Sequence, residues 1–345
     1  MNKDNYGGLD IFRPIAAILV IAIHTSPLEF ISPGADFFFT RLLARVAVPF
    51  FFMVTGQFVL GNVMYRKDNP IKIKRFIIKT AITYLAAIAV FLPFGLYLGH
   101  YKGFSFGMLL KMLFFDGTFY HLWYLPACIW GVLAVTLLSR FLKPNAVIAI
   151  TSVLYIIGVF GDSWYGAIEK IPVITDIYNG FFAVSSYTRN GIFFAPLFLA
   201  LGAVLGQRKK RPKAYPSLVM FLISLIFMSA EGFTAALAGL QRHDSMYFFL
   251  PVLMFFLYRL LLSGSLPSRP GLRRISMLVY ILHPIVIMGV REMGRLFRIT
   301  PVLVGNGIVH FILVSIISFV GAGIIFVLYP KLKNRIFRKK IKTSS

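Results

Sequence analysis

The chain has 345 residues, of which 58% are hydrophobic and 14% charged, and its mean hydropathy is +0.78. Soluble domains carry about 25% charged residues, so this composition excludes an ordinary soluble protein. The 36 Lys and Arg outnumber the 12 Asp and Glu, a surplus that in a soluble protein would indicate a nucleic-acid partner. Cys128 is the single cysteine, which excludes an intrachain disulfide and a cysteine-based zinc or haem site. The sequence predicts a polytopic membrane protein.

An all-α membrane fold follows from the apolar segments. A helix needs about 20 mainly apolar residues to cross about 30 Å of hydrocarbon. Ten segments match this pattern, the fifth and sixth being short: 10–28, 44–62, 76–98, 121–141, 145–161, 191–207, 216–236, 245–263, 274–292 and 307–329. The first does not have the form of a cleaved signal peptide, because Asp10 and Arg13 stand at its head and no small-x-small site follows His24. The amphipathic segment 105–119 is predicted to be an interfacial helix.

The basic residues give the expected orientation. Of the 36 Lys and Arg, 25 fall in one alternating set of loops, 10 in the opposite set, and Arg13 lies inside a span. The positive-inside rule places the larger set, with both termini, in the cytoplasm. The loops 63–75 and 208–213 are then cytoplasmic and 162–190 is outside. The basic surplus is explained by topology, so no nucleic-acid partner is expected. We divide the chain into a membrane domain, 1–330, and a basic cytoplasmic tail, 331–345.

Ionisable residues within spans are expensive in a bilayer, and each is a candidate functional residue. In the first span, Arg13 and His24 are 11 residues apart, which puts them on one helix face about 16 Å apart along the axis. Asp10 lies one turn before Arg13 and can pair with it. The alternative is a snorkelling arginine and a hydrogen-bonded histidine at the interface.

Two further spans carry polar groups at their ends. Arg45 opens the second predicted span, in which Pro49 can kink the helix and Gly56 permits close packing. His121 begins the fourth span at the outer interface.

Other polar and aromatic groups have competing interpretations. For Trp123 and Tyr124 an interfacial aromatic belt is favoured over a binding role. Glu231 lies late in a span on the outer side, as a neutral carboxyl or as a charged one that needs a partner; both interpretations remain open. For His283 a structural role is favoured, because Pro284 frees a backbone carbonyl that the imidazole could satisfy.

The available chemistry is limited. The sequence contains no paired-carboxylate site, no serine in a nucleophile elbow and no glycine-rich phosphate loop. A histidine of near-neutral pKa can take a proton from a hydroxyl or an amine, and a cytoplasmic cation can hold the phosphates of an anionic donor. This combination suits acyl transfer through the membrane, with the donor inside and the acceptor outside.

Several segments resemble a known family. Arg13-x10-His24, RVAVPFFFMVTG (45–56) and YILHP (280–284) resemble the membrane acyltransferase-three family, ten-span bacterial enzymes that modify cell-envelope sugars and related acceptors. Four more segments are similar to the membrane domain of VanT-type serine racemases of vancomycin-resistance clusters: FYHLWYLPA (119–127), GDSWYG (161–166), TRNGIFFAPLFLALG (188–202) and HDSMYFFLP (243–251). Together these segments extend from residue 8 to about residue 290.

The resemblance implies acyl-CoA, with acetyl-CoA expected, as the donor, and His24 as the catalytic residue. Arg13 is implied as its partner in the signature, and we expect it, held by Asp10, to anchor the donor. We place four residues on the outer acceptor side: Arg45, His121, Trp123 and Glu231. No metal and no pyridoxal phosphate are expected, and the expected location is the bacterial cytoplasmic membrane.

A racemase domain follows the membrane part in the VanT-type proteins. The present sequence ends in KIKTSS without room for such a domain, so we do not expect this chain alone to racemise an amino acid. A racemase, fused or separate, is an implied partner. The main alternative function is L-serine transport. Many transporters contain inverted repeats, and none is visible in this sequence, which argues against transport. A scaffold or sensor would leave the polar stripe of the first span unexplained.

Overall fold

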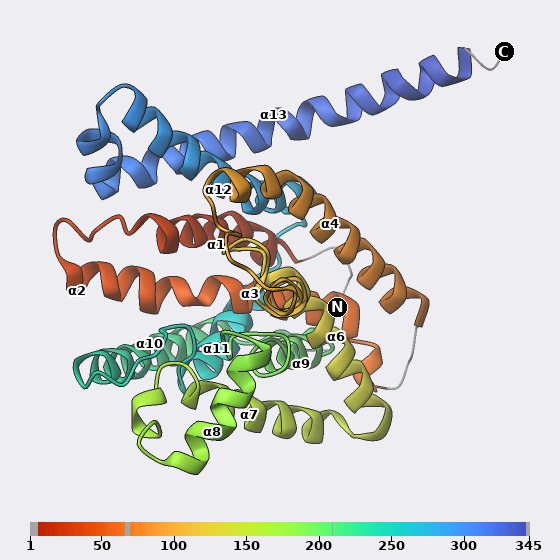
Figure 1. Ribbon diagram of the computed structural model, residues 1–345. Helices are drawn as coiled ribbons and strands as arrows, with labels where there is room; N and C mark the ends of the chain where they lie inside the picture. The colour runs from red at the N-terminus through yellow and green to blue at the C-terminus, as the bar shows by residue number, and fades with distance from the viewer. Residues whose placement is uncertain (1–5, 66–69, 209, 343–345) are drawn as a thin grey trace. The chain divides into compact units, whose positions relative to one another are not determined.

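The structure is a computed structural model that describes residues 6–65, 70–208 and 210–342 (Figure 1). Several basic residues on which the orientation depends lie outside the described residues: Lys3, Arg66, Lys67 and Lys209. The same holds for the side chains of the predicted tail from Lys331 onward. Every regular element in the described part is helical, which confirms the all-α class.

The α-helices follow one another along the chain with short connections. Their bounds are α1 Gly7–Thr25, α2 Pro33–Asp36, α3 Ala47–Thr55, α4 Pro70–Tyr97, α5 Phe106–Lys111, α6 Tyr124–Phe141, α7 Pro144–Phe160, α8 Pro172–Val184, α9 Ala195–Gly206, α10 Ala214–Leu237, α11 Leu250–Ser263, α12 Pro270–Leu296 and α13 Gly307–Lys342. Short π-helical or 3-10 segments connect several of them.

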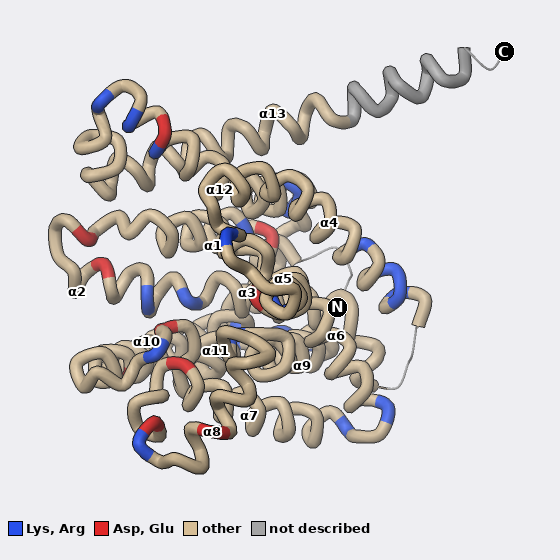
Figure 2. The backbone as a smooth tube through the Cα atoms, in the orientation of Figure 1, with Lys and Arg blue, Asp and Glu red and all other residues tan. Residues whose placement is uncertain are grey.

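Within the described residues, seven helical elements are long and apolar enough to cross a membrane. Three shorter apolar helices, α7, α9 and α11, coincide with the predicted spans that remain. A polytopic membrane protein is therefore confirmed, while the number of ten spans and the cytoplasmic location of both termini stay predictions. The basic residues of α4 gather in its first half, as the predicted orientation requires (Figure 2).

The second span begins earlier than predicted. The expected range was 44–62, but a continuous helical stretch runs from Pro33 to Leu60. It passes through a π-helix at Phe37–Leu42 and a 3-10 turn at Leu43–Val46 before α3 begins. The buried Asp36 carboxylate fixes the start by accepting the backbone N–H of Leu28 at 2.9 Å and the Thr40 hydroxyl at 3.1 Å. Arg45 consequently lies inside the helical stretch and not at its head.

Three other helices begin later than predicted, and before two of them, α9 and α11, side chains hold the preceding backbone. The predicted starts 121, 191 and 245 become Tyr124, Ala195 and Leu250. Before α9, for example, the Asn190 side-chain oxygen accepts the N–H groups of residues 192 and 193. The segment 105–119 is helical over α5 and a π-helix that ends at Asp116, so the helix is shorter than expected.

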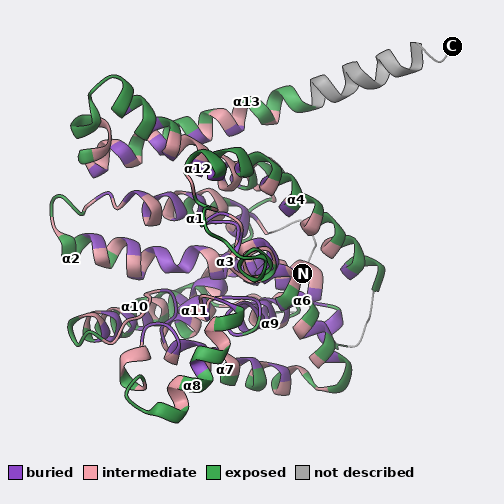
Figure 3. Cartoon of the chain, viewed as in Figure 1, coloured by how far each residue is buried: buried purple, intermediate pink, exposed green. Residues whose placement is uncertain are grey.

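The chain forms two compact units, of which the first comprises Val48–Gly264. Its centre is α9, most of which is buried (Figure 3). A Cβ on Gly56 would lie 1.9 Å from the Leu199 carbonyl oxygen, and one on Gly202 would lie 1.9 Å from the Met53 carbonyl oxygen. The predicted close packing at Gly56 is confirmed, and its partner is α9.

The second unit comprises Asn2–Ala47 and Ser265–Ser345. In it α1, α12 and α13 pack against one another. Their core is aliphatic, with Ile21 of α1, Val279 of α12 and Val314 of α13 fully buried. This packing places one face of α1 directly against α12, and the polar groups of α1 lie along that contact.

Candidate functional site

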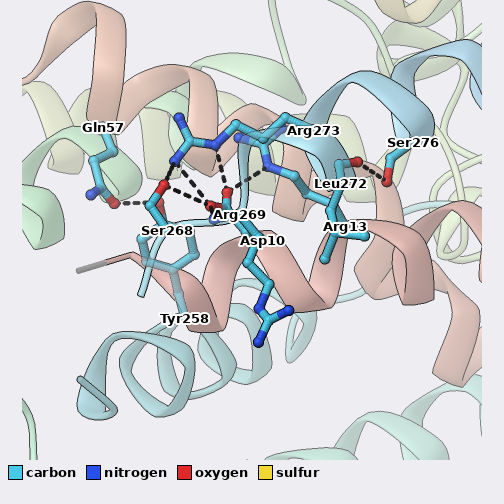
Figure 4. Close-up of polar contacts among 9 residues, drawn as sticks. All are labelled: Asp10, Arg13, Gln57, Tyr258, Ser268, Arg269, Leu272, Arg273 and Ser276. Carbon is cyan, nitrogen blue, oxygen red and sulfur yellow. Dashed lines mark hydrogen bonds and ion pairs between the residues drawn. The ribbon is translucent and has the colours of Figure 1, made fainter. Parts of the chain in front are cut away.

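The first polar contact between α1 and α12 is centred on the carboxylate of Asp10, whose side chain is 1% exposed (Figure 4). Arg273 of α12 donates from Nε to Oδ1 at 2.7 Å and from Nη2 to Oδ2 at 2.9 Å. Oδ2 also accepts the Arg269 backbone N–H at 2.7 Å and the Ser268 hydroxyl at 3.1 Å. The carboxylate thus holds both the N-terminus of α12 and its first-turn arginine.

The predicted pairing of Asp10 with Arg13 is present but is the weaker contact. Arg13 Nε lies 3.5 Å from Asp10 Oδ1, whereas Arg273 makes a bidentate pair with the same carboxylate. Sequence reasoning missed Arg273, which it counted only as a topological charge. The available signal was an arginine directly before the predicted span 274–292, where a buried acid on another span could meet it.

The second polar contact joins His24 in the last turn of α1 to His283 in the middle of α12. The two imidazole rings are stacked, with centroids 5.6 Å apart and planes inclined by 22°. His283 is fully buried, and its Nδ1 lies 3.1 Å from the Val279 carbonyl oxygen. The imidazole is bonded to its own helix as expected, and the acceptor of this bond is the Val279 carbonyl, one residue before the carbonyl that Pro284 frees. The contact with His24 was not foreseen.

These two contacts show that α1 and α12 run in parallel. The polar groups are separated by about 21 Å along α1, from Asp10 to His24, and by about 15 Å along α12, from Arg273 to His283. Asp10 supplies one negative charge beside the guanidinium groups of Arg13 and Arg273, so this end is cationic overall. One face of α1 therefore presents a cationic end and an imidazole end, as the 11-residue spacing predicts.

The remaining predicted site residues are divided between the units. Arg45 belongs to the second unit and is buried in the 3-10 turn that packs against α1. His121 belongs to the first unit and lies in the turn before α6. The centroid of its ring lies 4.7 Å from that of Phe91 and 5.8 Å from that of Phe119. Because His121 is buried and packs edge-on against aromatic rings, its surroundings are those of a histidine in the protein core.

Trp123, also in the first unit, supports a cation. The Arg189 guanidinium carbon lies 5.3 Å from the Trp123 ring centroid and 4.3 Å from that of Tyr187. Arg189 also donates to the Ser245 hydroxyl at 3.1 Å. Trp123 therefore has a polar partner in addition to the belt role that its sequence context favoured.

Glu231 of α10 holds the beginning of α11. Its Oε1 accepts the Phe248 backbone N–H at 2.7 Å and the Trp164 indole N–H at 3.0 Å, and its Oε2 accepts the Phe249 N–H at 3.0 Å. A carboxylate at a helix N-terminus is stabilised by the exposed N–H groups and the helix dipole. A charged Glu231 would therefore have its partner in the N–H groups at the beginning of α11.

A second buried carboxylate, Asp162, holds the same loop and was missed by sequence reasoning. Its Oδ1 accepts the N–H groups of Ser245 and Met246 at 2.6 and 2.9 Å. Burial raises the pKa of Asp162 to about 6, although these two hydrogen bonds and the charge of Arg189 act in the opposite direction. The loop between α10 and α11 is therefore tied down by two acids.

Comparisons with known proteins agree with this architecture. The family model for the acyltransferase domain matches residues 6–327. Two proteins of Enterococcus faecalis, each named amino-acid racemase, are 38% and 39% identical to the chain over 98% and 96% of its length and 48% and 46% of theirs. A serine/alanine racemase of Enterococcus gallinarum is 38% identical over 90% of this chain and 44% of its own. No solved structure matches.

The fold and the polar face of α1 define a multi-pass helical membrane protein. The chain belongs to the acyltransferase-three family, because that family model covers nearly all of it. It spans less than half the length of the racemase-named relatives it matches. The resemblance inferred from Arg13, His24 and the VanT-like segments is confirmed.

Proposed function

We propose that this chain, in the bacterial cytoplasmic membrane, transfers an acyl group from cytoplasmic acyl-CoA to an extracytoplasmic hydroxyl or amine. Membership of the acyltransferase-three family supports acyl transfer. The observation that carries the proposal is the face of α1, which has Arg13 near one end and His24 about 16 Å further along. In this proposal Arg13 binds the phosphates of the donor, and the thioester of the same extended molecule is presented to His24.

Arg13 is the proposed phosphate anchor. Arg273 uses Nε and Nη2 to hold Asp10, while the Arg13 Nε lies 3.5 Å from the same carboxylate. A guanidinium can bind phosphate oxygens in a bidentate manner, and the cationic surplus at this end favours an anion. Asp10 supports donor binding by fixing the two arginines and not by touching the donor.

His24 is the proposed general base. Its imidazole takes the proton of the acceptor hydroxyl or amine while that oxygen or nitrogen attacks the thioester carbonyl. The carbon–sulfur bond then breaks, the electron pair leaves with sulfur, and the imidazolium returns the proton to give free coenzyme A thiol. His24 is neutral at the beginning and at the end, and the acyl group is bonded to the acceptor.

The acceptor side is proposed to involve Arg45, His121, Trp123 and Glu231. The aromatic packing of His121 and the helix-end contacts of Glu231 favour a supporting role in which they shape the loops. Arg45 and Trp123, which belong to different units, are each by itself a better candidate for acceptor contact, since Arg45 is a buried cation and Trp123 an aromatic surface.

A second candidate function is L-serine transport. The names of the relatives favour it, because a serine/alanine racemase consumes serine and the chain matches less than half of that protein. In this role the chain would supply substrate to a racemase, fused or separate. Transport predicts uptake of serine without any acyl donor.

The experiment uses one preparation of the purified chain in proteoliposomes, with labelled acetyl-CoA and labelled L-serine. For an acyltransferase, His24→Ala and His24→Asn should lower acyl turnover by about 10²–10⁴-fold while acetyl-CoA binding is retained. Arg13→Ala should lose donor binding, and Arg13→Lys should keep only part of it because the bidentate geometry is lost. Serine uptake without donor, together with acyl turnover that is absent or unaffected by His24→Ala, would refute the enzyme in favour of the transporter.

A further inference from the structure

The feature that the proposed mechanism leaves unused is His283, which lies fully buried in α12 against the ring of His24. A buried imidazole in the aliphatic contact between α1, α12 and α13 is costly compared with an apolar side chain. Leucine or phenylalanine would fill similar space without a polar group. The structure therefore calls for a reason for an imidazole ring at this place.

A hydrogen bond to its own helix fixes the orientation of the His283 ring. The Val279 carbonyl oxygen, 3.1 Å from Nδ1, can only accept a hydrogen bond, so Nδ1 carries the proton of the neutral ring. This bond to its own helix holds the ring plane, much as a backbone carbonyl holds the histidine ligands of metal sites. The tautomer and the plane of His283 are thus set within α12, independently of His24.

The fixed ring then presents a flat face to His24. A centroid distance of 5.6 Å and a plane angle of 22° describe a loose parallel stack. His24 is only half-buried and lies in the last turn of α1, two residues before Ser26, whose φ of 43° ends the helix. Without a neighbour, a side chain at a helix end would be free to take several rotamers.

We propose that His283 is a positioning residue for His24. This inference rests on the proposed function of His24 as general base. The His283 ring face limits the rotamers of His24, so its nitrogen is aimed at the acceptor and not at the lipid or the helix end. This effect acts on the chemical step, whereas donor phosphates are held elsewhere on α1.

Three variants separate the ring from the packing volume. His283→Leu removes the flat ring, and we expect the acyl-transfer kcat to fall by about 10–100-fold with KM for acetyl-CoA unchanged. His283→Phe keeps a ring of similar size but loses the bond to the Val279 carbonyl that holds the ring plane, so we expect its kcat to lie between those of His283→Leu and wild type. Val290→Ala is the matched control, because it opens a cavity on the buried face of the same helix without removing a ring. It should lower the melting temperature and leave kcat unchanged.

A second measurement reports the ring contact without depending on turnover. The chain has six histidines, whose Cε1–H signals can be assigned by NMR of histidine-labelled protein with single His→Gln variants. The His24 signal should shift in His283→Leu, return towards wild type in His283→Phe, and stay in place in Val290→Ala. A His24 signal that His283→Leu leaves unmoved would overturn the inference, as would an active wild type whose kcat is unchanged in that variant. If the wild type transfers no acyl group but the His24 signal moves as expected, the proposed function fails and only the geometric part of the inference survives.

Discussion

Asp10 of α1 and Arg273 of α12 form a bidentate ion pair across 263 residues of sequence, with nitrogen–oxygen distances of 2.7 and 2.9 Å. The carboxylate is buried, while the arginine side chain is 35% exposed. The exposed pair Arg295–Glu292 has a similar distance of 2.9 Å, yet its side chains are 72% and 48% exposed. The two pairs differ mainly in burial, which makes them a natural comparison.

Removal of either partner of the Asp10–Arg273 pair should destabilise the chain. Loss of one member of a fully buried pair costs about 3–5 kcal/mol, and partial exposure of Arg273 reduces this to about 1–3 kcal/mol. Thermal unfolding in detergent of Asp10→Asn, Arg273→Gln and the double variant should show strong coupling, with the double variant less unstable than the sum. Glu292→Gln, the control, should cost at most about 0.5 kcal/mol. Additive effects would show that the pair does not hold α1 to α12.

The orientation is tested by two matched exposed lysines. Lys170 lies in the segment predicted to be outside, and Lys210 in the loop predicted to be cytoplasmic. In a background in which the buried Cys128 is replaced by alanine, Lys170→Cys should react with an impermeant maleimide on intact cells. Lys210→Cys should react only after permeabilisation. Labelling of Lys210→Cys on intact cells would show that the orientation is the reverse of the predicted one. The proposed donor site would then face away from cytoplasmic acyl-CoA.

Glu231 should act as a helix-end residue. Glu231→Gln leaves one of the Phe248 and Phe249 N–H groups facing an amide NH2, and an unsatisfied buried donor costs about 1–3 kcal/mol. We expect faster hydrogen exchange at residues 248 and 249 and a lower melting temperature. Trp164→Phe removes only the indole hydrogen bond to Oε1 and should cost about 0.5–1.5 kcal/mol. Unchanged exchange in Glu231→Gln, with altered acyl-acceptor kinetics, would favour direct acceptor contact instead.

What the sequence could predict was local. The pairing of Asp10 with Arg13 needs only the three-residue spacing, and the small side chain of Gly56 already indicated a close crossing. Arg273 and the Leu199 partner of Gly56 could not be found, because they depend on which helices lie side by side in the folded chain.

The same limit explains the errors at helix starts and at His283. The acids that hold the loop before α11, Asp162 and Glu231, lie far from it in sequence, so an apolar run at 245–249 was mistaken for helix. A bond of His283 to its own helix could be predicted, since that contact is within one turn, although its acceptor, the Val279 carbonyl, lies one residue before the carbonyl that Pro284 frees. Its stack with His24 follows from the parallel packing of α1 and α12, which no sequence pattern specified.

Asp162 gives the chain a predictable pH dependence. Burial is the largest cause that raises its pKa from 3.8 to about 6 in the folded state, so the folded chain binds the proton more tightly than the unfolded chain. The stability that this proton contributes is complete below pH 3.8 and is lost as the pH rises through about 6, a change on the order of 2–3 kcal/mol.

Asp162→Asn isolates this contribution, because asparagine keeps an oxygen for the Ser245 and Met246 N–H groups but cannot ionise. Melting temperatures measured from pH 4 to pH 8 should therefore show wild type losing stability relative to Asp162→Asn up to about pH 7, with a constant difference above it. Asp176→Asn on the exposed face of α8 is the control, since it removes the same formal charge without touching a buried group. Its curve should stay parallel to that of wild type. Parallel curves for wild type and Asp162→Asn as well would mean that Asp162 does not carry a buried proton in this range.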